Sequence, residues 1–264
     1  MKLFKRLVVL LMVLTLGLTG CSSNDSSDKS ALDKIKDADV IKIGVKSDVP
    51  NFGLQNTSTN EYEGLEIDLA KEIAKEILGD ESKVEFTAVT AKTRGPLLEK
   101  GELDMVIATF TITDERKETY NFSTPYYEDP VQLLIREEDS DKYTTLKDFD
   151  GKTIGVAKSS TTKEILSEEA SKLGITLNFN EYDSYPDINT ALDGKRIDCF
   201  SVDGSILRGY LTGHKLLDDK YAPQEYGVAT AKENTDLADE VDKIIGELKD
   251  SGKLDEMVTK WGLD

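Results

Sequence analysis

Two arginines flank a run of hydroxyl residues in one central segment of the chain. Arg94 precedes a strand-like stretch, residues 104–110, and Arg116 follows it, with Thr109 and Thr111 at the end of the stretch. A guanidinium binds a carboxylate through two parallel hydrogen bonds, which suits recognition of a small carboxylic acid. No nucleophile stands beside a base in this segment. These residues therefore predict half of a binding site for a small ligand that carries carboxylates.

The rest of the chain offers little for catalysis or for metal binding. The single histidine, His214, lies in a polar stretch and is expected to be a solvated loop residue. Cys199 lies in an apolar run, where a buried inert thiol is expected. We therefore predict no catalytic residue, no cofactor and no histidine-based metal site, while a metal site made of carboxylates alone stays open.

The N-terminus predicts export. Residues 1–20 start with basic side chains and continue with an apolar run over residues 7–16, which is too short to span a bilayer that needs about twenty residues. This pattern is typical of a secretory signal peptide. Because Cys21 directly follows Leu-Thr-Gly, we expect a bacterial lipoprotein with the lipid on Cys21 and a flexible tether over residues 21–35. The alternative is an ordinary signal peptide with an incidental cysteine.

The charge of the chain excludes one class of partner. The full chain carries 33 Lys and Arg against 51 Asp and Glu, and cleavage before Cys21 would remove three of the basic residues, leaving 30 against 51 and a net charge of −21. A nucleic-acid binder needs a basic patch, so nucleic acid is excluded, and the lipid alone should hold the protein at the membrane. A strongly acidic surface favours a soluble monomer. Lipidation of Cys21 would leave Cys199 as the only cysteine available, so no intramolecular disulfide is predicted.

Strands and helices are expected to alternate along the first part of the chain. The predicted order is a strand at 41–45, a helix at 66–78, a strand at 84–89, a helix at 93–100 and a strand at 104–110. This alternation is typical of an open α/β sheet.

The pattern restarts near residue 152. A strand at 152–156 is followed by a helix at 161–173, and the spacing from Leu98 to Asp104 recurs from Leu192 to Asp198. The common order in both halves favours two similar α/β lobes. Their predicted bounds are residues 36–128 plus 225–264 for lobe 1 and residues 129–224 for lobe 2. Two crossing segments, near residues 125–135 and 221–229, would form a hinge that lets the lobes close on a ligand.

Several motifs occur in an order that resembles a known family. They are Gly64-Leu-Glu-Ile-Asp68, Thr111-x4-Arg116, Phe122-Ser-x-Pro-Tyr126, Ser160-Thr161 and Gln224-x-Tyr-Gly227. Over about residues 36–263 the chain is similar to solute-binding proteins of polar amino-acid ABC importers, which have the two-lobed type II periplasmic-binding fold. The segments Ala91-Lys-Thr-Arg94-Gly-Pro96 and Tyr185-Pro186 are similar to the branch that binds aspartate and glutamate.

The resemblance implies a role for each matching residue. Arg116 would bind the ligand α-carboxylate together with Thr111, and Asp203 would hold the ligand α-ammonium. Ser160 and Thr161 would add a hydroxyl and a helix N-terminal N–H from lobe 2, where partial positive charge favours an anion. The same two residues could instead only cap that helix.

The resemblance also suggests which residues select the ligand side chain. Arg94 would contact it from lobe 1, Lys46 follows the first strand nearby, and Tyr185 would add a phenolic hydrogen bond from lobe 2. Two cations at this end favour a side-chain carboxylate over an amide. A solvated Lys46 and a packing Tyr185 are the alternatives.

One position departs from the pattern of related proteins. Ala91 stands where binders of neutral amino acids carry an aromatic cover, so Phe52 or Phe110 is expected to cover the ligand instead. Four acids at turns or helix starts are expected to be structural: Glu66, Asp68, Asp104 and Asp198.

Together these features predict a lipid-anchored extracytoplasmic receptor that closes on aspartate or glutamate and delivers it to an ABC permease and its ATPase. Three alternatives stay open: a receptor for glutamine or another polar amino acid, a dehydratase of cyclic dienyl acids, and a ligand-sensing domain.

Overall fold

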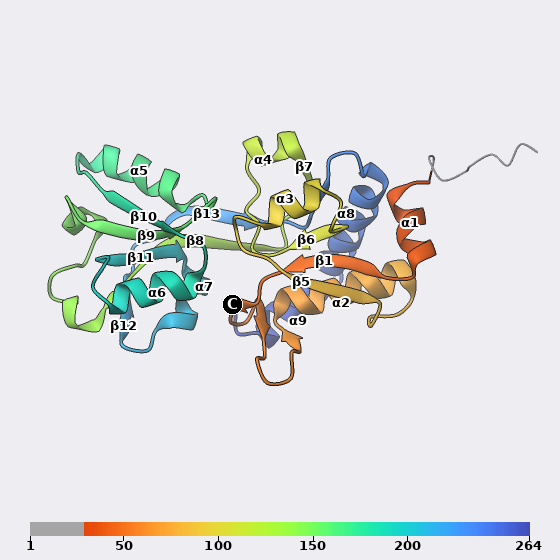
Figure 1. The fold of residues 1–264 in the computed structure, drawn as a ribbon, viewed down its shortest axis with the longest axis horizontal. Coiled ribbons are helices and arrows are strands. Elements are labelled where there is room, and N and C mark those ends of the chain that lie inside the picture. Colours follow the sequence, from red (N-terminus) through yellow and green to blue (C-terminus); the bar gives the residue numbers. More distant parts are fainter. Residues whose placement is uncertain (1–28) are drawn as a thin grey trace, which may run out of the picture.

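The computed structural model of the chain describes residues 29–264, which form two α/β lobes lying side by side along the long axis of the molecule (Figure 1). The predicted signal peptide, the lipidation site Cys21 and most of the predicted tether lie outside the described residues.

Lobe 1 is built on a five-stranded sheet in which β1 lies between two parallel neighbours, β5 and β6. The strand order across this sheet is β5 (Val84–Ala88), β1 (Ile41–Val45), β6 (Met105–Ile107), β14 (Ala229–Ala231) and β7 (Tyr120–Phe122). A small antiparallel sheet contains β2 (Asp48–Val49), β3 (Gly53–Gln55) and β4 (Tyr62–Glu63). The helices of this lobe are α1 (Ala31–Ala38), α2 (Leu65–Leu78), α3 (Arg94–Glu99), α4 (Asp114–Thr119), α8 (Thr235–Asp250) and α9 (Lys253–Lys260).

Lobe 2 repeats the same principle, with β9 between the parallel strands β10 and β11. Its strand order is β10 (Asn178–Tyr182), β9 (Thr153–Ala157), β11 (Cys199–Asp203), β8 (Tyr127–Arg136) and β12 (His214–Leu216). Its helices are α5 (Thr162–Leu173), α6 (Tyr185–Asp193) and α7 (Gly204–Leu207), with short 3-10 turns at Glu137–Asp139, Leu146–Phe149 and Arg208–Tyr210.

Two equivalent aspartates explain the spacing that is repeated in the two halves of the sequence. In lobe 1 the Asp104 carboxylate accepts a hydrogen bond from the Lys42 N–H at 2.8 Å, and the Asp104 N–H donates to the Lys42 carbonyl at 2.8 Å. In lobe 2 Asp198 does the same with Thr153, at 2.9 and 2.8 Å. Each aspartate thus ties the start of one buried strand to its parallel neighbour, which is the structural role expected for both residues.

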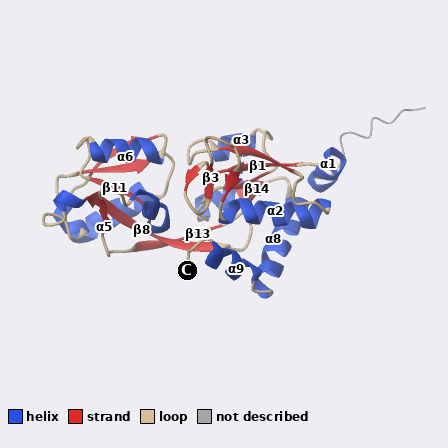
Figure 2. Ribbon diagram, turned by 90° about the horizontal axis from the view of Figure 1, so that it is seen from below, coloured by secondary structure: helices blue, strands red, loops and turns tan. Residues whose placement is uncertain are grey.

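The two lobes are joined by the antiparallel pair β8 and β13 (Tyr221–Tyr226), which runs from one lobe into the other (Figure 2). Tyr127 lies opposite Tyr226 at one end of the pair, and Val131 lies opposite Tyr221 at the other, with an irregularity between Tyr221 and Pro223. The predicted hinge therefore consists of two paired strands rather than two independent linkers.

After β13 and β14 the chain returns to lobe 1, where α8 and α9 pack against α2. Trp261 takes part in this packing, and its indole N–H donates to the Asp68 carboxylate at 2.8 Å. Asp68 also pairs with Lys260 at 2.6 Å. Asp68 therefore has the structural role expected for it, and Trp261 is a packing residue.

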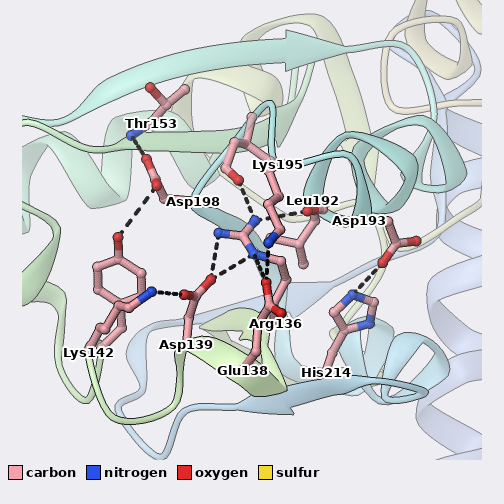
Figure 3. A network of polar contacts seen from close by, with 12 residues as sticks. Arg136, Glu138, Asp139, Lys142, Thr153, Leu192, Asp193, Lys195, Asp198 and His214 are labelled. Atoms are coloured by element: carbon pink, nitrogen blue, oxygen red, sulfur yellow. Dashed lines mark hydrogen bonds and ion pairs between the residues drawn. The ribbon is translucent and has the colours of Figure 1, made fainter.

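His214 is not a solvated loop residue, and that expectation was wrong. It begins β12, where its side chain is buried and its Nδ1 lies 2.8 Å from the Tyr210 carbonyl oxygen. Its Nε2 lies 2.8 Å from Asp193 (Figure 3). Beside it the Arg136 guanidinium donates to the Leu192 carbonyl at 2.9 Å. Arg136 thus satisfies a carbonyl group at the end of α6, where helix carbonyl groups lack partners.

Two further observations concern the described residues. Cys199 is a buried free cysteine, as expected, and burial raises the pKa of its thiol. Between residues 29 and 264, none of the helices combines the length and the apolar character that crossing a membrane requires.

Candidate ligand-binding site

The residues predicted to bind the ligand gather where the two lobes face each other. In lobe 1, Lys46 directly follows β1, Thr109 and Thr111 follow β6, and Arg94 begins α3. The carboxyl ends of parallel strands are the edge at which α/β sheets bind ligands. The sheet topology therefore brings these residues, which are far apart in the sequence, to one edge of lobe 1.

Arg116 reaches from lobe 1 to lobe 2. It lies in α4, whose N-cap Thr113 accepts a hydrogen bond from the Arg116 N–H at 3.1 Å. Its Nη1 donates to the Thr111 carbonyl at 2.7 Å and its Nη2 donates to the Ser159 carbonyl of lobe 2 at 3.0 Å. Burial, and then the charge of Arg94, lower the pKa of Arg116 to about 9, so the guanidinium stays charged at neutral pH.

Arg94 is almost fully buried beside Arg116. Its Nη1 donates to the carbonyl groups of Ala108, at 2.5 Å, and Thr109, at 2.9 Å. Both guanidinium groups lie against the ring of Phe110, at 4.1 Å for Arg94 and 4.9 Å for Arg116. Cation–π contacts of this kind stabilise buried cations. Phe110 therefore supports the two arginines. The neighbouring residue Thr109 adopts a left-handed backbone conformation with φ of 46°.

The other candidate for an aromatic cover, Phe52, lies against the hinge. Its ring is fully buried, 5.1 Å from the ring of Tyr127 and 5.9 Å from that of Tyr226. Its ring thus packs against the two crossing strands.

Lys46 is buried, but its charge already has a partner within the protein. Its Nζ lies 3.0 Å from Asp48 Oδ1 and 4.6 Å from the centre of the Tyr185 ring, which comes from lobe 2. Burial lowers the pKa of Lys46, and Asp48 acts against this shift. The alternative of a solvated Lys46 is therefore wrong. Because Asp48 already pairs with Lys46, only Arg94 is left of the two cations expected to face the ligand side chain.

Asp203 is the acid that lobe 2 presents at the end of β11. It is 6% exposed, and its Oδ2 accepts a hydrogen bond from the Tyr226 hydroxyl at 2.5 Å. Burial, together with the nearby charge of Asp129, raises the pKa of Asp203 to about 7, whereas Arg94 and Arg116 act to lower it. A buried carboxylate is costly unless a cation meets it, so this position suits a cationic ligand group.

Ser160 and Thr161 form the turn that leads into α5. The Ser160 hydroxyl donates to the Ala157 carbonyl at 2.8 Å, and the Thr161 hydroxyl donates to Gln224 in hinge strand β13 at 2.7 Å. With Arg116 and Ser159 they line a groove of about 490 Å³ between the lobes. Thr161 is the N-cap of α5, but its hydroxyl contacts the hinge rather than the helix.

Glu66 is a residue whose importance the sequence reasoning missed. It is fully buried, and its Oε1 accepts hydrogen bonds from the Thr109 N–H at 2.5 Å and the Tyr126 hydroxyl at 2.6 Å. Burial raises the pKa of Glu66, while these hydrogen bonds and the charges of Lys46 and Arg94 act to lower it. A signal was present in the sequence, because Glu66 lies on the apolar face of α2, four residues before Ala70.

Several contacts hold the two lobes together around this site. Besides the contact of Arg116 with Ser159, the Tyr210 hydroxyl of lobe 2 donates to the Asp48 carbonyl at 3.0 Å, and Lys92 pairs with Asp183 at 3.3 Å. Among residues 29–264, no group of three or more His, Cys, Asp or Glu side chains is arranged to hold a metal ion.

Comparison with known proteins places this geometry in a family. Residues 41–264 match the bacterial extracellular solute-binding proteins, family 3. The chain belongs to this family.

Relatives and solved structures agree with the family. The chain is 36% identical to the ABC transporter glutamine-binding protein GlnH of Bacillus subtilis, over 98% of this chain and 97% of the relative. It is 28% identical to the glutamate-binding protein GluB of Corynebacterium efficiens, over 92% and 85% of the two chains. A crystal structure of a mutant of ArgBP from T. maritima superposes with a TM-score of 0.79 at 27% identity, over 89% of this chain and 100% of that one.

These comparisons confirm the predicted fold of two α/β lobes as well as the predicted family. The aspartate/glutamate branch is not confirmed, since the family member GlnH shares more of this sequence than GluB does.

Proposed function

We propose that this chain is the extracytoplasmic receptor of an ABC importer and captures one free amino acid between its lobes. The observation that carries the proposal is that a cation and an acid come from opposite lobes. Arg116 of lobe 1 donates to the Ser159 carbonyl of lobe 2 at 3.0 Å, and Asp203 of lobe 2 accepts from the Tyr226 hydroxyl of the hinge at 2.5 Å. A free amino acid carries one carboxylate and one ammonium. Arg116 would bind the first of these, and Asp203 would bind the second.

Two classes of ligand side chain are supported by specific observations. Aspartate and glutamate are supported by the buried cations Arg94 and Lys46 at one edge of lobe 1. Glutamine is supported by the ion pair between Lys46 and Asp48, which balances the charge of Lys46 within the protein, and by the similarity to GlnH. At this edge of lobe 1 the two cations Lys46 and Arg94 are matched by two acids, Asp48 and Glu66. A ligand with a neutral side chain would leave this balance of charge unchanged.

We also propose that the mature chain is a monomer anchored to the cell membrane through a lipid on Cys21, with a permease and an ATPase as partners. A receptor is favoured over an enzyme because the only histidine, His214, is held by Tyr210 and Asp193 inside lobe 2. Incubation with a cyclic dienyl acid is expected to give no product, and turnover would contradict this part of the proposal.

Calorimetry on a soluble protein that starts near Ser26 tests the function. The protein is unfolded and refolded first, so that any carried-over ligand is removed. We expect glutamine or the two acidic amino acids to bind with micromolar affinity, about −8 kcal/mol, and arginine and histidine to bind at least ~30-fold more weakly. A correctly folded protein that binds none of them would contradict the proposal.

The affinity is expected to depend on pH through Asp203. Its pKa in the ligand-free protein is about 7, so below pH 7 the carboxyl must lose a proton before it can bind the ligand ammonium. Affinity should therefore be level above about pH 7 and fall by up to about tenfold per pH unit below it. Titrations between pH 5 and pH 8 measure this slope, and an affinity that rises as pH falls would contradict it.

A further inference from the structure

Among the buried polar atoms of lobe 1 that have no hydrogen-bond partner in the part of the chain that the structure describes, three belong to neighbouring residues. They are Glu66 Oε2, Arg94 Nε and Thr109 Oγ1. Each of these three residues is at most 3% exposed, so water does not satisfy them from the surface. Buried polar groups in folded proteins are normally hydrogen-bonded, and an exception calls for a physical reason.

The three residues are direct neighbours. The Thr109 N–H donates to Glu66 Oε1 at 2.5 Å, and Arg94 Nη1 donates to the Thr109 carbonyl at 2.9 Å. Thr109 therefore links a carboxylate whose Oε2 is unpaired to a guanidinium whose buried Nε–H is unpaired within the described residues. This cluster lies at the carboxyl ends of β1 and β6, the same edge of lobe 1 that carries Thr111.

The unsatisfied atoms define the chemistry that would complete the cluster. Glu66 Oε2 is an acceptor and needs a donor, whereas Arg94 Nε–H is a donor and needs an acceptor. A carboxamide supplies both, through its NH₂ group and its carbonyl oxygen. A carboxylate supplies acceptors only, and it would place a second negative charge beside Glu66.

We propose that Glu66 is a specificity-determining residue of this receptor, whose Oε2 accepts a hydrogen bond from the side-chain NH₂ of a bound carboxamide. Arg94 Nε–H donates to the amide oxygen of the same ligand. Glutamine is then the preferred ligand over glutamate. This inference rests on the proposed function and makes it more specific. It assigns the selection between an amide and an acid ligand side chain to Glu66, which the sequence predicted to be structural.

The variant Glu66→Gln tests the inference. Its amide oxygen can still accept from the Thr109 N–H and the Tyr126 hydroxyl, while an NH₂ donor replaces Oε2. We expect the wild-type protein to bind glutamine at least ~10-fold more tightly than glutamate, and the variant to lower this ratio at least ~30-fold, as measured by calorimetry. The charge-matched control is Glu72→Gln, which removes an acid of the same helix that pairs with Lys253, and it should leave the ratio unchanged.

A ligand analogue tests the same contact without any change to the protein. The γ-methyl ester of glutamate is neutral, like glutamine, but lacks the N–H donor. We expect it to bind the wild-type protein at least ~10-fold more weakly than glutamine, since it leaves Glu66 Oε2 without a partner.

The outcomes separate this inference from the proposed function. An equal loss of both ligands in Glu66→Gln would show a purely structural role and overturn the inference, while the receptor function stands. Tighter binding of glutamate than of glutamine by the wild-type protein, or equal binding of the ester and the amide, would overturn it as well. A wild-type protein that binds no amino acid would overturn both.

Discussion

Replacing Arg116 with alanine is expected to weaken amino-acid binding by about 30-fold to several thousandfold. Arg116 is the cation assigned to the ligand α-carboxylate, and truncation of one partner of a buried charged pair costs about 2–5 kcal/mol. All amino acids in a calorimetric panel should lose affinity by a similar factor, because the α-carboxylate is common to them.

The neighbouring lysine provides a control for this experiment. Lys117 lies next to Arg116 in α4, is exposed, and makes only a 3.5 Å ion pair with Asp114. Lys117→Ala removes the same charge from the same helix and is expected to change affinity less than ~3-fold, since exposed ion pairs contribute about 0–1 kcal/mol. If Arg116→Ala and Lys117→Ala behave alike, Arg116 does not bind the carboxylate.

Replacing Asp203 with asparagine is expected to separate binding from stability. The ligand ammonium loses its counter-charge, so affinity should fall by about 2–5 kcal/mol, or about 30-fold to several thousandfold. The ligand-free protein should become as stable as the wild type or more stable at pH 7, because Asp203 is buried with a raised pKa and its ionisation opposes folding. Calorimetry and thermal unfolding without ligand measure the two effects.

The sign of this stability effect follows from the direction of the pKa shift. Asp203 has a folded-state pKa of about 7, above its unfolded value of about 3.9, so the folded state binds the extra proton between these pH values. The stability of the ligand-free wild type should therefore fall as pH rises from about 4 to about 7, and Asp203→Asn should lack this contribution.

Asp198 is the matched control, since it lies just before the same strand. Its carboxylate accepts from the Thr153 N–H at 2.9 Å, a structural contact. Asp198→Ala is expected to lower the unfolding free energy by about 1–3 kcal/mol and to leave affinity within a few-fold of wild type. An Asp203→Asn protein that is less stable but binds normally would contradict the assigned role of Asp203.

The sequence predicted the lobes because their main determinants are local. The sequence itself shows the alternation of strands and helices. It also shows the spacing from Leu98 to Asp104 that recurs from Leu192 to Asp198, and the equivalent backbone contacts of the two aspartates explain this repeated spacing. Arg116 could be predicted as a ligand-binding residue for the same reason, since it lies within a short motif that follows a strand.

Other features could not be predicted because they depend on contacts between distant segments. His214 was expected to be solvated because its flanking residues are polar, but pairing of β12 with β8 buries it against Asp193. Glu66 was placed at an ordinary helix start, whereas its partners Thr109 and Tyr126 lie some 40 and 60 positions further along the chain. In both cases the packing of the fold, rather than the neighbouring sequence, determines the environment.

A crystal structure of the refolded protein with glutamine is the most direct test of the central claim, that an amino acid binds between Arg116 and Asp203. We expect the α-carboxylate within hydrogen-bond distance of the Arg116 guanidinium and the α-ammonium within the same distance of Asp203. Glutamine bound outside the space between the lobes, or bound there with its α-carboxylate away from Arg116, would contradict the claim.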